Sequence, residues 1–216
     1  MRSGSIVVAF IVTCCLWNGA NASTLLFDSV NDTGSILYST TQAGATLSAT
    51  VDFELTAWTM TSATFTVNVT NNSSGPGTNT LLGFGIDVVS PTLTGASGSG
   101  NWDAGINVVL PTFANVNLCM WASNGCPGGD IGNGLGEGLT DSFTLTLTSL
   151  GDFTQGISFT SPYGIKFQDV GNSGNSFEFA GDLPPPVHRD NSVPEPASIA
   201  LLGLGLAGLG FSRRKQ

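Results

Sequence analysis

The sequence predicts an all-β fold, an antiparallel β-sandwich of jelly-roll or lectin-like type. Three observations predict it. Apolar and polar residues alternate over short segments, and turn-forming residues separate those segments. The composition also favours strands over helices, because the 216 residues include 29 Gly and only 10% charged residues. Helices are expected only at the two ends, one in an N-terminal signal and a short hydrophobic one at the C-terminus.

The strict alternation is clearest in residues 45–57, 63–71 and 142–150, where nearly every second residue is apolar. A period of two is typical of strands with one buried face and one solvated face. Runs of Gly, Asn, Ser and Pro between the apolar segments predict turns. The remaining strands are expected at residues 25–28, 35–38, 81–89, 107–113, 116–121, 156–160, 164–169 and 176–180.

Residues 1–22 have the pattern of a secretory signal peptide. A basic residue near the start is followed by an apolar core and by Ala20-Asn21-Ala22, an A-x-A cleavage site. We therefore expect cleavage between Ala22 and Ser23, with export by the Sec machinery and removal of the signal by signal peptidase. The sandwich domain is expected at 23–183, and the Pro-rich segment 184–193 is expected to be a stiff linker.

The tail, residues 194–216, has three parts in a fixed order. Pro194-Glu195-Pro196 comes first, the uncharged apolar run 197–211 follows, and the basic cluster Arg213, Arg214 and Lys215 lies near the end. As a helix the run would be roughly 22 Å long, whereas a bilayer core needs roughly 20 residues. The run is thus suited to temporary anchoring in the inner membrane, with the basic end on the cytoplasmic side.

This tail resembles the PEP-CTERM sorting signal of Gram-negative bacteria. The resemblance rests on the residues Val193-Pro194-Glu195-Pro196, on the Leu- and Gly-rich span 201–210 and on the basic end. It implies recognition by an exosortase in the inner membrane, removal of the tail, and passage to the cell surface or to an extracellular polysaccharide matrix. The alternative is an ordinary short membrane anchor.

The body of the chain is strongly acidic. Between Ser23 and Val193 the only basic residues are Lys166 and Arg189, and fourteen acidic residues against these two leave a net charge of −12. Nucleic-acid binding depends on Lys and Arg contacts to phosphates. The sequence therefore disfavours nucleic acid as a partner.

Cys119 and Cys126 are the only cysteines beyond the predicted signal peptide. Six residues separate them, with Asn124-Gly125 as a turn signal, and an oxidising compartment favours a disulfide. A loop this short contributes about 2 kcal/mol through chain entropy. We expect the bond to pin the start of a mobile Gly-rich loop to its strand.

No residue pattern indicates catalysis. The single histidine, His188, lies in the Pro-rich linker, where no packed scaffold holds it against a nucleophile. Asp52 and Glu54 are expected side by side on one strand face, about 6.6 Å apart along the strand. This separation does not exclude a glycosidase pair, but a solvated strand face is the simpler interpretation, so we expect no enzyme.

Two features suggest ligand binding. The Gly-rich loop 128–137 carries Asp130, Asn133 and Glu137, which are oxygen ligands of the kind that calcium prefers. The alternative is a plain surface loop, and no cofactor is required. Trp58, Trp102 and Trp121 are candidates for stacking on sugars, although a buried Trp is the usual alternative.

The sequence thus predicts an exported, exosortase-sorted protein with a structural or adhesive role at the cell surface or in an exopolysaccharide matrix (biofilm). A carbohydrate- or calcium-binding module is the alternative. Ice binding is a third hypothesis, because ice-binding proteins can carry this tail and because Thr64-x-Thr66 and Thr144-x-Thr146-x-Thr148 form Thr rows. A flat ice-binding face would require these rows on adjacent, untwisted strands.

Overall fold

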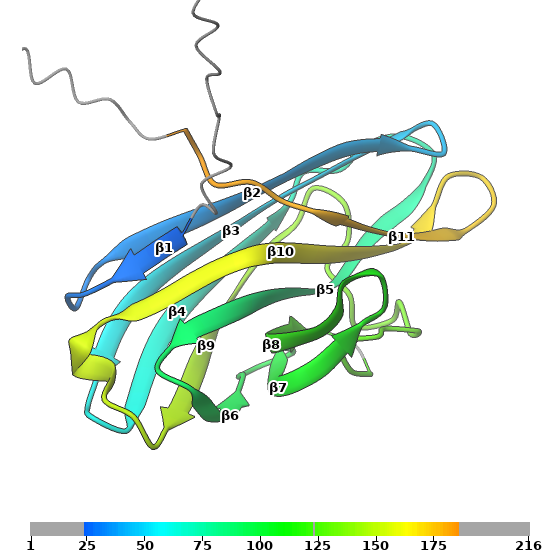
Figure 1. Ribbon diagram of the computed structural model, residues 1–216. Coiled ribbons are helices and arrows are strands. Elements are labelled where there is room, and N and C mark those ends of the chain that lie inside the picture. The colour runs from blue at the N-terminus through cyan, green and yellow to red at the C-terminus, as the bar shows by residue number, and fades with distance from the viewer. Residues whose placement is uncertain (1–23, 123, 186–216) are drawn as a thin grey trace, which may run out of the picture. The chain divides into compact units, whose positions relative to one another are not determined.

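The computed structural model describes residues 24–122 and 124–185 of the chain (Figure 1). The chain divides after Leu183 into two units, and the strands belong to the first. The predicted signal with its cleavage site Ala22–Ser23, most of the linker, and the tail lie outside the described residues, as do both expected terminal helices. Within the described residues, no helix has the length and apolar character needed to cross a membrane.

The described chain forms two antiparallel sheets that face each other across one core. The first sheet has the order β1-β10-β5-β8-β7, with β11 paired to β10, and the second has the order β2-β3-β4-β9-β6. The bounds are β1 Thr24–Phe27, β2 Thr33–Gln42, β3 Ala45–Trp58, β4 Ser62–Asn71, β5 Gly77–Ser90, β6 Leu93–Ser97, β7 Asp103–Leu110, β8 Ala114–Trp121, β9 Thr140–Ser149, β10 Ile157–Val170 and β11 Asn175–Ala180. The all-β prediction with antiparallel sheets is confirmed, and the jelly-roll or lectin-like subtype stays a prediction.

The alternating segments form the centre of the second sheet, as expected. β3 pairs with β4 and β4 pairs with β9, and their alternating apolar residues point to the core, except for Ala57, which is exposed after a register shift near the end of β3. Phe65 is fully buried, and its ring lies 5.1 Å from Phe27 and 5.5 Å from Phe159 of the opposite sheet. Aromatic contacts between the sheets, together with the burial of apolar area, hold the two layers together.

Three strands differ from the prediction. β7 is Asp103–Leu110 where the sequence indicated 107–113, because Pro111–Phe113 form a 3₁₀ turn. β10 is one continuous strand where the sequence indicated two, because the register shifts between Thr160 and Gly164 and so accommodates Pro162. Proline is tolerated at such an irregularity, because no backbone N–H is required there for the hydrogen bonds between strands. β6 was not predicted, since its five residues contain Gly and lack strong alternation. It pairs only with β9, at the edge of the sheet.

A turn and a loop segment cover part of the outer face of the first sheet, the face that points away from the second sheet. They are the 3₁₀ turn η1, Pro111–Phe113, and the Gly-rich segment 125–134. Gly164 permits the approach of η1, because a Cβ at this position would lie 2.5 Å from Leu110 Cδ2 and 2.7 Å from the Phe113 ring. Gly128, with φ +72°, lies in the same way over the Lys166 side chain.

Candidate functional site

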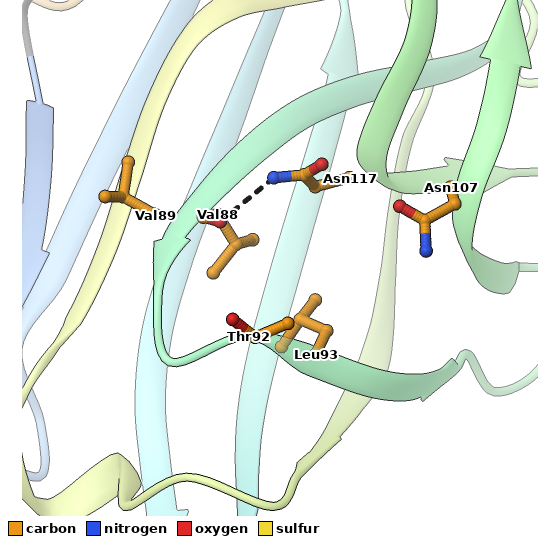
Figure 2. Close-up of a pocket in the computed structure, with 6 residues that line it drawn as sticks. All are labelled: Val88, Val89, Thr92, Leu93, Asn107 and Asn117. Carbon is orange, nitrogen blue, oxygen red and sulfur yellow. Dashed lines mark hydrogen bonds between the residues drawn. The ribbon is translucent and has the colours of Figure 1, made fainter.

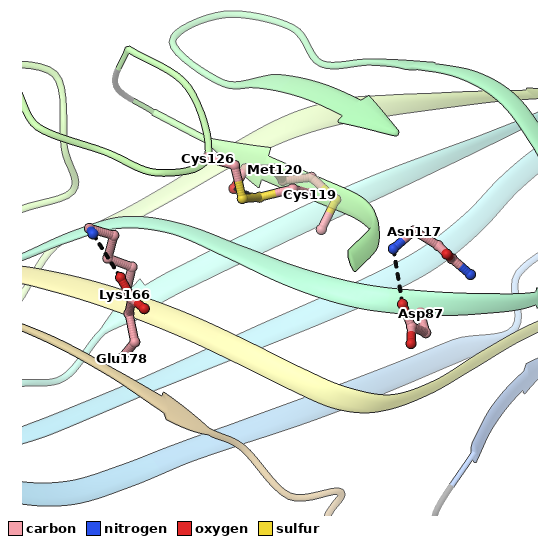
Figure 3. The surroundings of a disulfide bond; sticks show 7 residues. All are labelled: Asp87, Asn117, Cys119, Met120, Cys126, Lys166 and Glu178. Carbon is pink, nitrogen blue, oxygen red and sulfur yellow. Dashed lines mark hydrogen bonds and ion pairs between the residues drawn. A yellow bond between two sulfur atoms is a disulfide. The ribbon is translucent and has the colours of Figure 1, made fainter. Parts of the chain in front are cut away.

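The predicted disulfide is present. Cys119 and Cys126 are bonded, and their Cα atoms lie 6.1 Å apart, within the range of 4.4–6.8 Å expected for disulfides. Both cysteines are buried with Leu110 and Val116 in a small cluster on the outer face of the first sheet (Figure 3). The bond therefore ties the start of the Gly-rich segment to β8.

The residues that directly follow this segment are held by bonds that do not involve the disulfide. Leu135 and Leu81 exchange two backbone hydrogen bonds of 2.9 Å, and the Asn71 side chain donates to the Leu135 carbonyl at 2.9 Å. The backbone N–H of Gly138 donates to the Asn71 carbonyl at 2.8 Å. Residues 135–138 are therefore held by backbone bonds as well as by the disulfide, and such long-range bonds leave no local signal in the sequence.

The three calcium candidates have different settings. Asp130 Oδ1 accepts the Gly132 N–H at 2.8 Å, and Glu137 Oε2 accepts from Asn79 Nδ2 at 2.8 Å, whereas Asn133 lines a cavity. No cluster of three or more His, Cys, Asp or Glu side chains able to hold a metal ion occurs in residues 24–122 and 124–185. Calcium binding by Asp130, Asn133 and Glu137 stays a prediction.

A cavity of about 320 Å³ lies where the β6–β7 turn, the end of the Gly-rich segment and the start of β9 meet. We call it the loop cavity. Its walls combine buried apolar groups with exposed polar ones. The lining residues are Asn101, Trp102, Ala122, Asn133, Gly134, Leu135, Leu139, Thr140 and Asp141. It thus brings together Trp102 and Asn133, which the sequence had suggested for two different ligands.

Trp102 does not have the role expected of a stacking residue. It is only 2% exposed, and its ring stacks on Phe143 with 5.1 Å between centroids and 9° between planes. Its indole Nε1 donates to Asp141 Oδ2 at 3.0 Å. Trp102 therefore positions the Asp141 carboxylate at the cavity and does not offer a ring face to a ligand.

The other two tryptophans are only partly buried. Trp58, at the end of β3, packs against the main core, whereas Trp121 packs against the disulfide cluster on the outer face of the first sheet. The Trp121 ring lies over Gly105, and its register partner on β7 is Asp103, whose side chain is exposed. Trp121 and Trp58 are therefore the candidates for sugar stacking, and Trp102 is not.

A second cavity of about 270 Å³ lies between the turn after β5 and strands β7 and β8 (Figure 2). Its polar groups include the side-chain amides of Asn107 and Asn117. Asn117 Nδ2 donates to the Val88 carbonyl at 3.0 Å, and the Asn117 backbone N–H donates to Asp87 Oδ1 at 2.9 Å. These bonds join β8 to β5 just beyond their last paired residues, so Asn117 has a structural role there.

Asp52 and Glu54 lie on the outer face of the second sheet. The Ser35 hydroxyl donates to Asp52 Oδ1, and Glu54 lies between Thr33 and Thr66 of the flanking strands. The two Thr rows also lie on this face, since Thr64 pairs with Thr146 and Thr66 with Thr144 across adjacent strands. This hydroxyl face is formed by outward-facing residues of β2, β3, β4 and β9, most of which are Thr or Ser.

Lys166 is the only basic side chain in the described residues, and it is buried in an ion pair. Its Nζ lies 2.7 Å from Glu178 Oε1 (Figure 3). The Thr112 N–H donates to Glu178 Oε2 at 2.6 Å. Burial raises the pKa of Glu178, but these bonds outweigh burial and hold its pKa below its usual value. The exposed charges of the described body are therefore carboxylates.

Comparison with known proteins identifies only the tail. No curated protein and no solved structure matches the chain. Residues 192–215 match the PEP-CTERM protein-sorting motif, which confirms the resemblance, and the match leaves the two sheets outside it. The chain therefore carries the sorting motif of exosortase substrates, which implies an exported, exosortase-sorted protein of the cell surface.

Proposed function

We propose that this protein is a non-enzymatic structural or adhesive component of the cell surface or of an extracellular polysaccharide matrix. In this proposal the Sec machinery exports the chain and signal peptidase removes residues 1–22. The run 197–211 anchors the protein temporarily in the inner membrane until an exosortase acts near Pro194-Glu195-Pro196. The sorting motif at residues 192–215 is the observation that carries the proposal.

The surface chemistry of the body supports an adhesive role. The hydroxyl face presents many groups that both donate and accept hydrogen bonds, which is the bonding pattern of neutral polysaccharides. The exposed charged side chains of the described residues are carboxylates, since the one basic side chain there is buried in an ion pair. Such a surface favours neutral partners over nucleic acid and other polyanions.

The setting of the acidic pair supports a role without catalysis. A glycosidase holds two carboxyl groups on opposite sides of a scissile bond. Asp52 and Glu54 instead lie two residues apart on one strand, on the outer face of a sheet. Neither lines the loop cavity or the cavity beside Asn117.

The proposal is tested by expressing the full chain, tagged after residue 183, in cells with and without an exosortase. We expect a shortened protein at the surface or in the matrix of the first strain, and a full-length tail in the membrane fraction of the second. The purified body should co-sediment with the exopolysaccharide of the same cells. Identical location and tail length in both strains would contradict the sorting step. A purified body that does not co-sediment with the exopolysaccharide would contradict the adhesive role.

A carbohydrate- or calcium-binding module is the second candidate, and the loop cavity favours its carbohydrate form. Its polar rim and apolar floor are typical of small-ligand sites. Thermal melts with and without calcium test the ion at Asp130, Asn133 and Glu137. An unchanged melting temperature at millimolar calcium would remove calcium from this candidate.

Ice binding has one observation in its favour and one against it. The Thr rows of β4 and β9 are in register on adjacent strands. Figure 1 shows, however, that the strands of this sheet fan out with the usual twist, so the rows do not form a flat lattice. Thermal hysteresis no greater than that of a control protein would remove this candidate.

A further inference from the structure

We propose that the loop cavity is a binding site for one neutral sugar ring. This inference rests on the proposed adhesive function and deepens it by naming the site and the chemical class of the ligand. It depends on the fixed carboxylate of Asp141, on the charge of the cavity wall, and on the rigidity of that wall.

Asp141 is oriented before any ligand arrives. Its Oδ1 accepts a hydrogen bond from the backbone N–H of Ser142 at 2.8 Å, and its Oδ2 accepts one from the Trp102 indole N–H at 3.0 Å. The indole itself cannot turn, because it is buried between Phe143 and Phe84. A carboxylate offers about four acceptor positions, and these two bonds leave acceptor positions for ligand hydroxyls. A carboxylate held in this way loses less conformational entropy on binding than a freely rotating one.

The rest of the cavity complements a sugar ring. The exposed amides of Asn101 and Asn133 each provide both donors and acceptors, which match alternating ring hydroxyls. Ala122 and Leu135, 2% and 8% exposed, give an apolar floor for the C–H groups of the ring. The volume of about 320 Å³ lies near the lower end of the range of roughly 300–1,000 Å³ for small-ligand sites, so a single ring is the appropriate size.

The charge of the wall disfavours anionic ligands. Asp141 is the one charged side chain among the lining residues. Lys166, the single basic side chain of the described body, is bound to Glu178 under the Gly-rich segment. A uronic acid or a phosphorylated sugar would therefore meet repulsion without any compensating cation. A neutral sugar instead places hydroxyl donors on the carboxylate, and such bonds to charged groups are stronger than neutral ones.

The wall is also rigid. Asn71 is completely buried, and its side-chain amide donates to the carbonyls of both Asn79 and Leu135 at 2.9 Å. Together with the paired backbones of Leu135 and Leu81, these bonds hold the floor of the cavity against β4 and β5. The site is thus built on the sheets and not on a free loop.

The test uses the exported chain with uniform ¹⁵N labelling. It is titrated separately with the methyl glycosides of glucose, galactose, mannose and N-acetylglucosamine, and with glucuronic acid. We expect at least one neutral glycoside to shift the indole N–H signal of Trp102, which reports directly on Asp141, while the Trp58 and Trp121 signals stay unchanged. Asp141→Asn and Asn133→Ala should each weaken this binding, about tenfold or more for Asp141→Asn.

Two controls keep the result interpretable. Asp182→Asn removes an exposed carboxylate beside β2, at the far edge of the second sheet, and should bind like the wild type. Asn133 is exposed, so Asn133→Ala reports on binding even if Asp141→Asn unfolds. The site is overturned if no neutral glycoside shifts the Trp102 signal at tens of millimolar, if glucuronic acid binds more tightly than the neutral glycosides, or if only Trp121 responds. If the purified body still co-sediments with exopolysaccharide in such a case, only this site is rejected and the proposed adhesive function is not.

Discussion

The Lys166 ammonium lies 2.7 Å from the Glu178 carboxylate beneath the Gly-rich segment, and both side chains are less than 10% exposed. Glu178 comes from β11, a strand that pairs only with β10, and Lys166 comes from β10. The pair therefore joins this edge strand to the centre of the first sheet. The Thr112 N–H on Glu178 adds the turn η1 to the same junction.

Loss of one partner of this pair should be costly. Lys166→Met leaves the Glu178 carboxylate buried without its cation, and we expect the free energy of unfolding to fall by about 3–5 kcal/mol. The double variant Lys166→Met/Glu178→Leu should recover most of this loss, because it removes the unpaired charge. Urea denaturation of the single and double variants measures both effects. A single variant as stable as the wild type would show that the pair does not stabilise the fold.

The same pair predicts acid sensitivity. The pKa of Glu178 is below its usual value of 4.5 in the folded state, so its ionisation stabilises the fold above that pH, and this stabilisation is lost as the pH falls through the lower folded pKa. The slope of unfolding free energy against pH below 4.5 should therefore be shallower in Glu178→Gln than in the wild type. Equal slopes for Glu178→Gln and the wild type would contradict the assignment.

Removal of the disulfide should have a local effect. In the Cys119→Ala/Cys126→Ala variant we expect a loss of about 2 kcal/mol, since the closed loop is short. Hydrogen exchange should accelerate in residues 124–134, whereas residues 135–139 should stay protected by their bonds to Leu81 and Asn71. Exchange that accelerates equally in both segments would mean that the disulfide holds the whole loop.

The two faces of β4 should respond differently to truncation. Phe65→Ala opens a cavity in the aromatic cluster between the sheets, and we expect a loss of about 3–5 kcal/mol. The adjacent Thr66→Ala is on the outer face and should cost less than about 1 kcal/mol. Guanidinium denaturation of the two variants provides the comparison. Similar losses would be inconsistent with a core on the Phe65 side alone.

Replacement of Pro194-Glu195-Pro196 by three alanines should prevent sorting without preventing export. We expect the variant to accumulate in the membrane fraction with its tail intact, because the motif that the exosortase reads is gone. The control replaces Pro184-Pro185-Pro186 in the same way and should be sorted normally. Intact mass and cell fractionation measure the outcome, and normal release of the first variant would exclude the triplet as the determinant.

Much of the fold was predictable because alternation in sequence becomes burial in a sheet. The apolar positions of residues 63–71 are core residues, and the Cys119–Cys126 bond followed from spacing and compartment. The continuity of β10 through Pro162 was not predictable, since a register shift is a property of the paired strands. Nor was β6, whose few residues become a strand only because the exposed edge of β9 offers hydrogen bonds.

The sequence by itself determined the destination of the protein and the class of its body. A sorting motif is read as linear sequence, and alternating polarity specifies strands through local geometry. Only the tertiary structure decided what the individual side chains do. Trp102 is the buried support of Asp141 and not an exposed sugar platform, and the calcium candidate Asn133 also lines the same cavity. These residues come from segments far apart in the chain, and the pairing of sheets that brings them together leaves no local pattern.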